Sequence, residues 1–329
     1  MPNPAKRYTV GVPRKTDPRL SFDAYRYYLS AIYLLLEREY GSDPIQLSAL
    51  SQAINRRPAY QGIEPLTYAR PDRLAALIKN AWQTEVALKL PRLLEVEDEE
   101  FAALSIHWGT SQLYYAVYCA ASAWLEAMSG ANSPRTHREA LDKLAKYATT
   151  EAMFPLPWGA ACHSYTPVAY SGETAGYQYQ PRFVDHLHSP DLSTALDMVC
   201  LFLKTTRDKD LALRVATWKK KTNRERILRP ELRRLDSILQ PTTVFDFLWF
   251  LRKRATYEDA ELFLVGSTLE DDAVGYFDNL CRIGRASLLL FEKLLAKAYG
   301  RDNMERLARD FMSKSRYGKK TVGERIPYW

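Results

Sequence analysis

The eight residues from Arg252 to Asp259 (RKRATYED) bring arginine, tyrosine and carboxylate side chains close together in the sequence. An arginine can neutralise charge that develops on a phosphate, and a tyrosine can stack on an unpaired base. Tyrosine is a poor general base at neutral pH, because its ordinary pKa is about 10. The same residues can instead be structural, with Asp259 paired to Arg254 and Tyr257 closing a helical bundle. The segment is therefore a candidate for catalysis or phosphate binding, and both interpretations stay open.

Histidine is the side chain that most readily exchanges protons near neutral pH, and the chain contains five. His137 lies near the start of an expected helix, where it either contributes to a site or packs on the core. His163, His186 and His188 match no common zinc-ligand spacing, so we expect no bound metal. Arg182 precedes His188 by six positions, but both lie in an irregular segment, where such a pair readily arises by chance.

Several common catalytic and cofactor motifs are missing from the sequence. It contains neither GxxxxGK[ST] nor GxGxxG, the glycine-rich loops that hold phosphates. It also lacks the GxSxG and HExxH motifs of hydrolases. The sequence therefore predicts no cofactor.

Positive charge is concentrated in one part of the chain. The net charge is +7, but the segment from Lys204 to Arg254 alone holds 15 Lys and Arg against 6 Asp and Glu. This concentration indicates either a face that binds nucleic-acid phosphates or the solvated side of several helices. The candidate nucleic-acid contacts are Lys219, Lys220, Lys221, Arg224, Arg226, Arg233 and Arg234.

The composition is typical of a globular protein. Hydrophobic residues make up 47% and charged residues 26%, and the 14 glycines are few enough to favour helices. The four cysteines are scattered and form no CxxC pair, which indicates reduced thiols. The chain shows no signal peptide and no apolar run of about 20 residues, so we expect a soluble cytoplasmic protein that does not enter membranes.

Hydrophobic periodicity predicts helices along most of the chain. We expect Pro91 to end one helix, Ser133 with Pro134 to begin another, and Thr242 or Thr243 to cap a third. Residues 149–190 are rich in proline, glycine and aromatic residues, which predicts an irregular segment with room for a small β-hairpin. The expected helices span residues 21–40, 45–54, 72–89, 97–129, 133–147, 191–206, 210–221, 230–239, 242–255 and 272–299, with one more capped by Asp302.

These segments divide the chain into five parts. Residues 1–20 are expected to form an extended arm, because they contain four prolines among basic residues. The other parts are N-terminal helices with the first half of a helical core (21–148), an insertion (149–240), the second half of the core (241–300), and a C-terminal helix with a basic tail (301–329). The insertion would consist of an irregular part, 149–190, and a basic helical part, 191–240.

Two separated segments form a recognisable pattern. Residues 113–144 contain a Tyr-Tyr-Ala helix, a short turn and a Thr-His pair that opens a second helix, and residues 248–264 (LWFLRKRATYEDAELFL) precede a long helix. Together they resemble the HEPN superfamily, especially its small prokaryotic members. The resemblance implies an all-α fold with a HEPN-like four-helix bundle, extra N-terminal helices and the inserted subdomain. It also implies a homodimer in which the arginine-bearing segments of two subunits face each other.

Many relatives in that family are metal-independent ribonucleases of toxin–antitoxin, CRISPR-linked or phage-defence systems. Their active-site pattern is an arginine followed, after four to six residues, by a histidine. Neither Arg252 nor Arg254 has a histidine at that spacing. For an enzyme, the resemblance therefore implies a composite site that includes Arg252, Arg254, Tyr257 and Asp259, with His137 the histidine best placed to approach them.

Three functions remain open at this point. We favour a protein that binds RNA or single-stranded nucleic acid, with a partner protein from a defence or toxin–antitoxin system. The first alternative is a metal-independent endoribonuclease. The second is a nucleotide-sensing or assembly scaffold that uses the aromatic segment 149–190 as a pocket.

Overall fold

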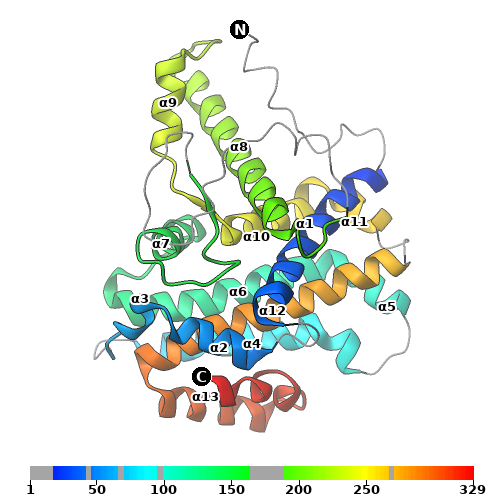
Figure 1. Cartoon of the computed structure of the whole chain (residues 1–329), viewed down its shortest axis with the longest axis vertical. Coiled ribbons are helices and arrows are strands. Elements are labelled where there is room, and N and C mark those ends of the chain that lie inside the picture. The colour runs from blue at the N-terminus through cyan, green and yellow to red at the C-terminus, as the bar shows by residue number, and fades with distance from the viewer. Residues whose placement is uncertain (1–17, 42–45, 66–69, 95–98, 164–188, 267–269) are drawn as a thin grey trace.

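The computed structural model describes residues 18–41, 46–65, 70–94, 99–163, 189–266 and 270–329. This part of the chain is almost entirely helical, which confirms the predicted all-α class (Figure 1). None of its helices is both long and apolar enough to cross a bilayer. The α-helices are α1 (Pro18–Tyr40), α2 (Leu47–Asn55), α3 (Pro58–Gln61), α4 (Pro71–Leu93), α5 (Glu99–Leu104), α6 (Ile106–Ser129), α7 (His137–Thr149), α8 (Ala195–Thr222), α9 (Arg229–Ser237), α10 (Val244–Lys253), α11 (Ala260–Gly266), α12 (Glu270–Tyr299) and α13 (Arg301–Lys314).

Helices α4, α6 and α12 form the centre of the molecule, and two glycines allow them to approach closely. A Cβ atom on Gly109 of α6 would lie 3.2 Å from Leu280 of α12 and 3.3 Å from Leu88 of α4. A Cβ on Gly284 of α12 would lie 3.3 Å from Leu113 of α6. Because these gaps are tighter than ordinary van der Waals contacts, a larger residue at either position would displace a buried leucine.

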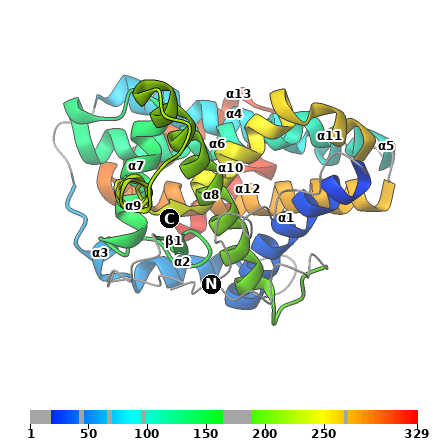
Figure 2. The ribbon, with the colours of Figure 1, turned by 90° about the horizontal axis from the view of Figure 1, so that it is seen from above.

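Helices α1, α8 and α10 pack together on one side of this centre (Figure 2). Their contact is aromatic: the Phe202 and Phe247 rings lie 4.2 Å apart between centroids, and Tyr28 lies 5.6 Å from Phe202. Helix α10 also packs against α6. The last turn of α10 is therefore held between α6 on one side and α1 with α8 on the other.

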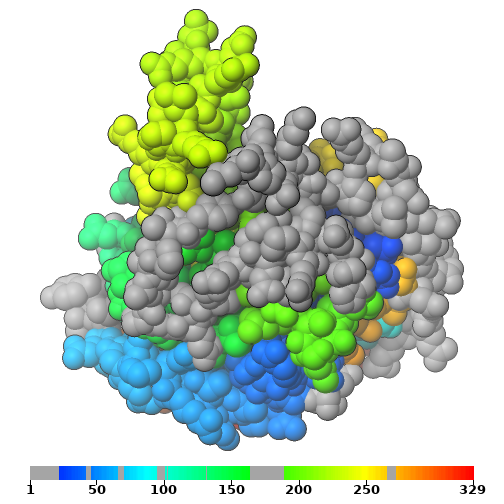
Figure 3. Space-filling view, turned by 45° about the horizontal axis from the view of Figure 1, so that its top comes forward, coloured from blue at the N-terminus to red at the C-terminus, as the bar shows by residue number. Residues whose placement is uncertain are grey.

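Helix α8 continues beyond this contact and, with α9, forms an arm that projects from the body (Figures 1 and 3). The first half of α8 is buried as far as Arg207, whereas residues 211–238 are mostly exposed. A 28-residue helix is about 42 Å long. We call residues 211–238 the basic arm, because they hold 9 Lys and Arg against 3 Asp and Glu.

Helix α7 begins at His137, three residues later than Pro134, so the predicted start at Ser133 and Pro134 is wrong. Thr136 is the N-cap, and its hydroxyl accepts a hydrogen bond from the Glu139 backbone N–H at 3.2 Å. The Glu139 carboxylate accepts one from the Arg135 N–H at 2.8 Å. The Thr136 hydroxyl thus satisfies one helix-end donor, and Glu139 also binds the backbone just before the cap.

Other helix ends also differ from expectation. Helix α4 does not end at Pro91 as predicted. The helical hydrogen bonds resume after the proline, with Leu94 N–H donating to the Leu90 carbonyl at 3.0 Å. Helix α1 begins at Pro18, inside the expected arm. Gly300, at φ +97°, rather than Asp302 precedes α13. The expected cap of α10 is confirmed as Thr243, whose side chain and N–H both contact the Asp246 carboxylate.

The described part of the irregular segment after α7, residues 150–163, contributes to the core. Strand β1 (Ala161–Cys162) pairs antiparallel with the distant strand β2 (Thr242–Thr243). Trp158 is fully buried, and its indole N–H donates to the Ser287 hydroxyl of α12 at 3.0 Å. Residues 164–188, which include Arg182, His186 and His188, lie outside the described residues.

The expected basic tail is packed into the protein as three short 3₁₀ turns, η5 (Gly318–Lys320), η6 (Val322–Glu324) and η7 (Ile326–Tyr328). Arg325 is fully buried and donates to the carboxylates of Glu85 and Glu292, with four N···O distances between 2.6 and 2.8 Å. The Trp329 ring stacks on Trp82 at 6.4 Å. We call Arg325, Glu85 and Glu292 the buried clasp, because they join the tail to α4 and α12.

Burial and the neighbouring positive charges shift the pKa of Glu85 in opposite directions. Burial alone raises the pKa of Glu85, but the positive charges of Arg325 and Lys89 and their hydrogen bonds outweigh it and lower that pKa to about 2. Glu85 is therefore ionised in the folded protein at neutral pH. The clasp holds two carboxylates against one guanidinium, with Lys89 2.9 Å from Glu85.

Candidate functional site

Arg252, in the last turn of α10, lies among tyrosines of α6 and of the π-helical turn η4 (Arg254–Glu258). Its Nη1 donates to the Tyr115 hydroxyl at 2.8 Å. Its guanidinium carbon lies 5.4, 5.5 and 5.9 Å from the ring centroids of Tyr114, Tyr115 and Tyr257. A cation held against several ring faces is stabilised by their quadrupoles. We call Arg252, Tyr114, Tyr115, Tyr118, Tyr257 and His137 the Arg252 cluster.

Arg252 has no carboxylate partner among the described residues. Its Nε is buried and has no hydrogen-bond acceptor in the described part of the chain. A buried donor without an acceptor is costly, and an anionic ligand would supply one. Tyr257, 71% exposed, and Tyr115, 38% exposed, keep the cluster open to solvent.

His137 joins this cluster from the first turn of α7. Its Nδ1 lies 2.5 Å from the Tyr114 hydroxyl oxygen, and its ring stacks on Tyr118 at 4.1 Å between centroids. Burial, and then the nearby charge of Arg252, lower the pKa of His137 below its usual value. The imidazole is therefore neutral at pH 7. When Nδ1 carries the proton and donates it to the tyrosine oxygen, Nε2 has a lone pair that can accept a proton.

Arg254 and Asp259 belong to a different environment. Arg254 Nη1 donates to Asp259 at 3.0 Å, and the Tyr25 hydroxyl of α1 donates to the same carboxylate oxygen at 2.6 Å. Arg254 Nε also lies 2.9 Å from the Glu258 carboxylate. Arg254 thus has two carboxylate partners where Arg252 has none in the described residues.

The structure therefore divides the predicted catalytic residues into two groups. Arg252, Tyr257 and His137 come together, although His137 and Arg252 are far apart in the sequence. Arg254 and Asp259 pair with each other beside α1, as the structural interpretation of the segment predicts, but Tyr257 is exposed and does not close the bundle. Arg252 and Arg254 are two residues apart and so point away from each other on the helix. The π-helical turn, which includes the bond from Asp259 N–H to the Arg254 carbonyl, brings Asp259 next to Arg254.

The seven candidate nucleic-acid contacts all lie on the basic arm. Six of them are exposed, and Lys219 is partly exposed. Arg224 pairs with Glu231 at 3.1 Å and lies 6.0 Å from the Trp218 ring centroid. Their positions fit both open interpretations, because an arm that projects into solvent is a solvated face and is also accessible to phosphates.

Sequence reasoning did not assign the tyrosines of α6 to the site. Tyr114 and Tyr118 are four residues apart, so they share a helix face, and Tyr115 lies beside them. This spacing was a usable signal for a tyrosine-lined surface. The side chain that meets it, Arg252, comes from a helix more than 100 residues away and is not indicated by spacing.

Two broader comparisons complete the description of the site. Among the described residues, no three His, Cys, Asp or Glu side chains gather in a way that could hold a metal ion. Comparison with protein-family models, curated protein sequences and solved structures gave no match to this chain.

Proposed function

We propose that the chain is a HEPN-like RNA-binding protein that takes the RNA on the Arg252 cluster and the basic arm. The observation that carries the proposal is Arg252, a partly buried cation without a carboxylate partner in the described residues, next to exposed tyrosines. A phosphate would supply its missing acceptor, and Tyr115 and Tyr257 offer ring faces to unpaired bases. The proposal places the protein in a prokaryotic defence or toxin module, as the family resemblance suggests.

The packing of four helices supports the HEPN-like part of the proposal. The two resembling segments correspond to α6 with α7 and to α10 with α11, followed by α12. Helix α6 packs against α12 and α10, and α10 contacts α7. The proposed core is thus α6, α7, α10 and α12, with the Arg252 cluster at the junction of the first three.

Removing charge from the basic arm should change the salt dependence of RNA binding. Each phosphate contact contributes about 0.7 to the slope of log K against log salt for a single strand, so replacing Lys219, Lys220 and Lys221 by alanine should lower the slope by about 2. The measurement is fluorescence anisotropy of a labelled single-stranded RNA across a salt series. Arg252→Gln should weaken binding at every salt concentration.

A matched control removes three charges elsewhere. Arg306, Arg309 and Lys314 are exposed on α13, and their triple alanine variant should keep the wild-type slope. An arm variant with the same slope as the wild type would mean that the arm is only a solvated face. Wild-type protein that binds no RNA would contradict the proposed function itself.

RNA cleavage without a metal is the second candidate function, and the neutral His137 beside Arg252 favours it. Nε2 of His137 would take the proton of a ribose 2′-hydroxyl as that oxygen attacks the adjacent phosphorus. Arg252 would neutralise the charge that develops on the phosphate oxygens. The bond to the 5′-oxygen of the next nucleotide then breaks, and a proton from solvent completes the leaving hydroxyl.

A homodimer belongs to the same proposal. Helices α5, α6 and α11 are in contact and carry exposed apolar side chains beside the Arg252 cluster: Phe101, Leu104, Trp108 and Leu264 are 40%, 58%, 62% and 58% exposed. Joining two such faces would bring two Arg252 clusters near each other and bury these side chains.

Polar substitutions on this face should abolish the dimer. We expect wild-type protein to have the mass of a dimer in size-exclusion chromatography with light scattering, and the Trp108→Ser, Leu264→Ser variant to have that of a monomer. The control is Leu213→Ser with Leu228→Ser, which removes apolar side chains that are 55% and 62% exposed on the basic arm. A monomeric wild type, or a control that also dissociates, would contradict this assignment.

A further inference from the structure

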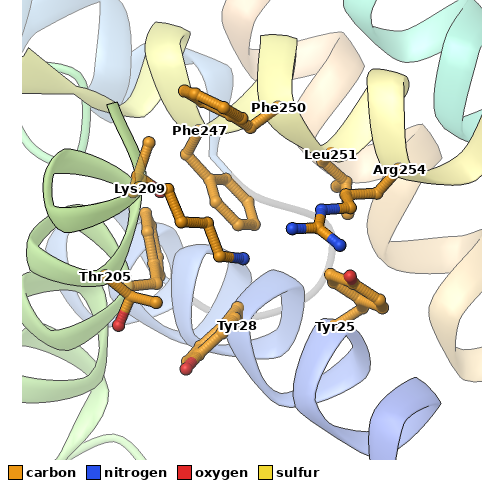
Figure 4. Close-up of a pocket in the computed structure, with 10 residues that line it drawn as sticks. Tyr25, Tyr28, Thr205, Lys209, Phe247, Phe250, Leu251 and Arg254 are labelled. Carbon is orange, nitrogen blue, oxygen red and sulfur yellow. The ribbon is translucent and has the colours of Figure 1, made fainter. Parts of the chain in front are cut away.

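A pocket separate from the Arg252 cluster lies between α1, α8 and α10. Its walls are mainly aromatic and include Tyr25 and Tyr28 of α1, Phe202 of α8 and Phe247 of α10. Lys209 of α8 and Arg254 of η4 extend into it from opposite sides, above the two tyrosines (Figure 4). Two cationic groups therefore face each other inside an aromatic enclosure.

Neither cationic group is fully partnered. Lys209 forms no hydrogen bond or ion pair with any described residue. Arg254 directs Nη1 to Asp259 and holds Nε near Glu258, but its Nη2 has no hydrogen-bond partner in the described ranges. An ammonium group that is partly buried among apolar side chains loses part of its hydration without a compensating contact in the described residues, which is unfavourable for folding.

The electrostatics of the pocket reflect this imbalance. Burial, followed by the repulsion of Arg254, lowers the pKa of Lys209 to about 8, and the carboxylates of Asp259 and Glu258 oppose the shift only in part. Tyr25 and Tyr28 stay protonated, because burial raises the pKa of both hydroxyls. Both carboxylates contact Arg254, so Lys209 is the group left without a counter-charge.

We propose that this pocket binds the phosphate group of a small phosphorylated ligand, with its oxygens between Lys209 Nζ and Arg254 Nη2. A phosphate supplies acceptors to both cations and relieves their mutual repulsion. The space between the rings is only about 20 Å³, which leaves room for a phosphate oxygen but not for an aromatic base. This site does not depend on RNA binding at the Arg252 cluster.

Phosphate-dependent stabilisation of the full-length protein tests the proposal. Calorimetric titration and thermal melting should be carried out with inorganic phosphate and with AMP, each against chloride at equal ionic strength. We expect both phosphates to bind and raise Tm in the wild type, with AMP binding no more tightly than inorganic phosphate because its base finds no room between the rings. No effect beyond that of chloride would overturn the proposal.

Two variants separate the site from general charge effects. Lys209→Met keeps the length of the side chain but removes its charge, so it should weaken binding at least tenfold while Tm without ligand stays the same or rises. Lys314→Met removes an exposed lysine of α13 and should bind as the wild type does. Wild-type affinity in Lys209→Met would overturn the proposal.

A pH series on the wild type gives an answer even if that variant fails to fold. Sulfate is the probe, because it does not titrate near neutral pH. Lys209 is charged below about pH 8 and neutral above it, so sulfate affinity should fall several-fold between pH 7 and pH 9. An affinity that stays constant over this range would argue against Lys209 as the ligand-binding cation.

Discussion

Replacing Arg325 by methionine should lower the free energy of unfolding by about 3–5 kcal/mol, because it takes the shared guanidinium away from two buried carboxylates. Glu85 and Glu292 are 1% and 0% exposed, and in the described structure Arg325 is the only residue that bonds both. Lys89 can offset part of the charge of Glu85 only. Urea unfolding at pH 7, followed by circular dichroism, measures the change.

The control is Arg38→Met, which removes an exposed arginine paired with Glu39. Exposed pairs contribute about 0–1 kcal/mol, so this variant should unfold close to the wild type. Adding Glu85→Gln and Glu292→Gln to Arg325→Met should recover part of the lost stability. A loss below about 1 kcal/mol in Arg325→Met would contradict the clasp as a stabilising element.

The effect should also depend on pH. Glu85 has a pKa of about 2 in the folded protein, against about 4.3 in an unfolded chain. A carboxyl group whose pKa is lowered by folding stabilises the native state above its unfolded pKa, and this contribution is lost as pH falls through its folded pKa. The difference in the free energy of unfolding between wild type and Arg325→Met should therefore have its full value at pH 6 and be smaller near pH 2.

Replacing Arg252 by glutamine should slow RNA cleavage about a hundredfold if the Arg252 cluster is catalytic, which corresponds to about 3 kcal/mol in the barrier. Folding should survive, because Arg252 forms no carboxylate pair among the described residues. The measurement is single-turnover cleavage of labelled RNA in EDTA, with Tm recorded on the same preparation. Arg254→Ala should instead lower Tm, because it leaves Asp259 without its guanidinium partner.

The pH dependence of cleavage distinguishes a catalytic base from a structural histidine. If His137 is the base, the rate should rise with pH through a pKa below 6.5, because burial and Arg252 disfavour the protonated imidazole. Arg252→Gln removes the positive charge, so its residual activity should rise at higher pH than that of the wild type. Arg285→Gln, which alters a partly exposed arginine of α12, should change neither rate nor profile. A wild type that does not cleave would leave binding as the function of the cluster.

Helices with a long apolar repeat could be placed from the sequence alone. The long apolar repeats of α1 and α12 predicted those helices within a few residues, because a helix with one apolar face buries that face. Helix ends were predicted wrongly where two neighbouring residues could each begin or end the helix. Pro134 suggested an earlier start for α7, but the bonds between Thr136, Glu139 and the backbone decided the position.

Contacts between distant segments were not predictable in the same way. The tail after α13 is rich in basic residues, which locally indicates a solvated segment, but Arg325 meets Glu85 and Glu292 inside the protein. A single sequence contains no signal that pairs one arginine with two particular glutamates. The strand pair β1–β2 joins residues about 80 positions apart and was missed for the same reason.

The candidate site was also predictable in its local part and not in its contacts with distant segments. The segment 252–259 could be selected because its chemistry is concentrated in eight residues. The different directions of Arg252 and Arg254 follow from helical spacing. The contacts that bring Arg252 and His137 into one cluster, and the π-helical turn that places Asp259 beside Arg254, are not specified by local sequence. Lys209 was also missed, because a lysine within a basic helix looks like a solvated residue unless the neighbouring helices are known.

The buried clasp has a consequence for synthesis of the chain. Arg325 follows Tyr299, the last residue of α12, by 26 residues, which at 5–20 residues per second is roughly 1–5 s of translation. During that interval α4, α6 and α12 can assemble only without the guanidinium, with Glu85 paired to Lys89 and Glu292 bonded to the Trp82 indole N–H. The last turns of the chain therefore act as a late closing step, before which the helical body is held together less tightly than in the finished protein.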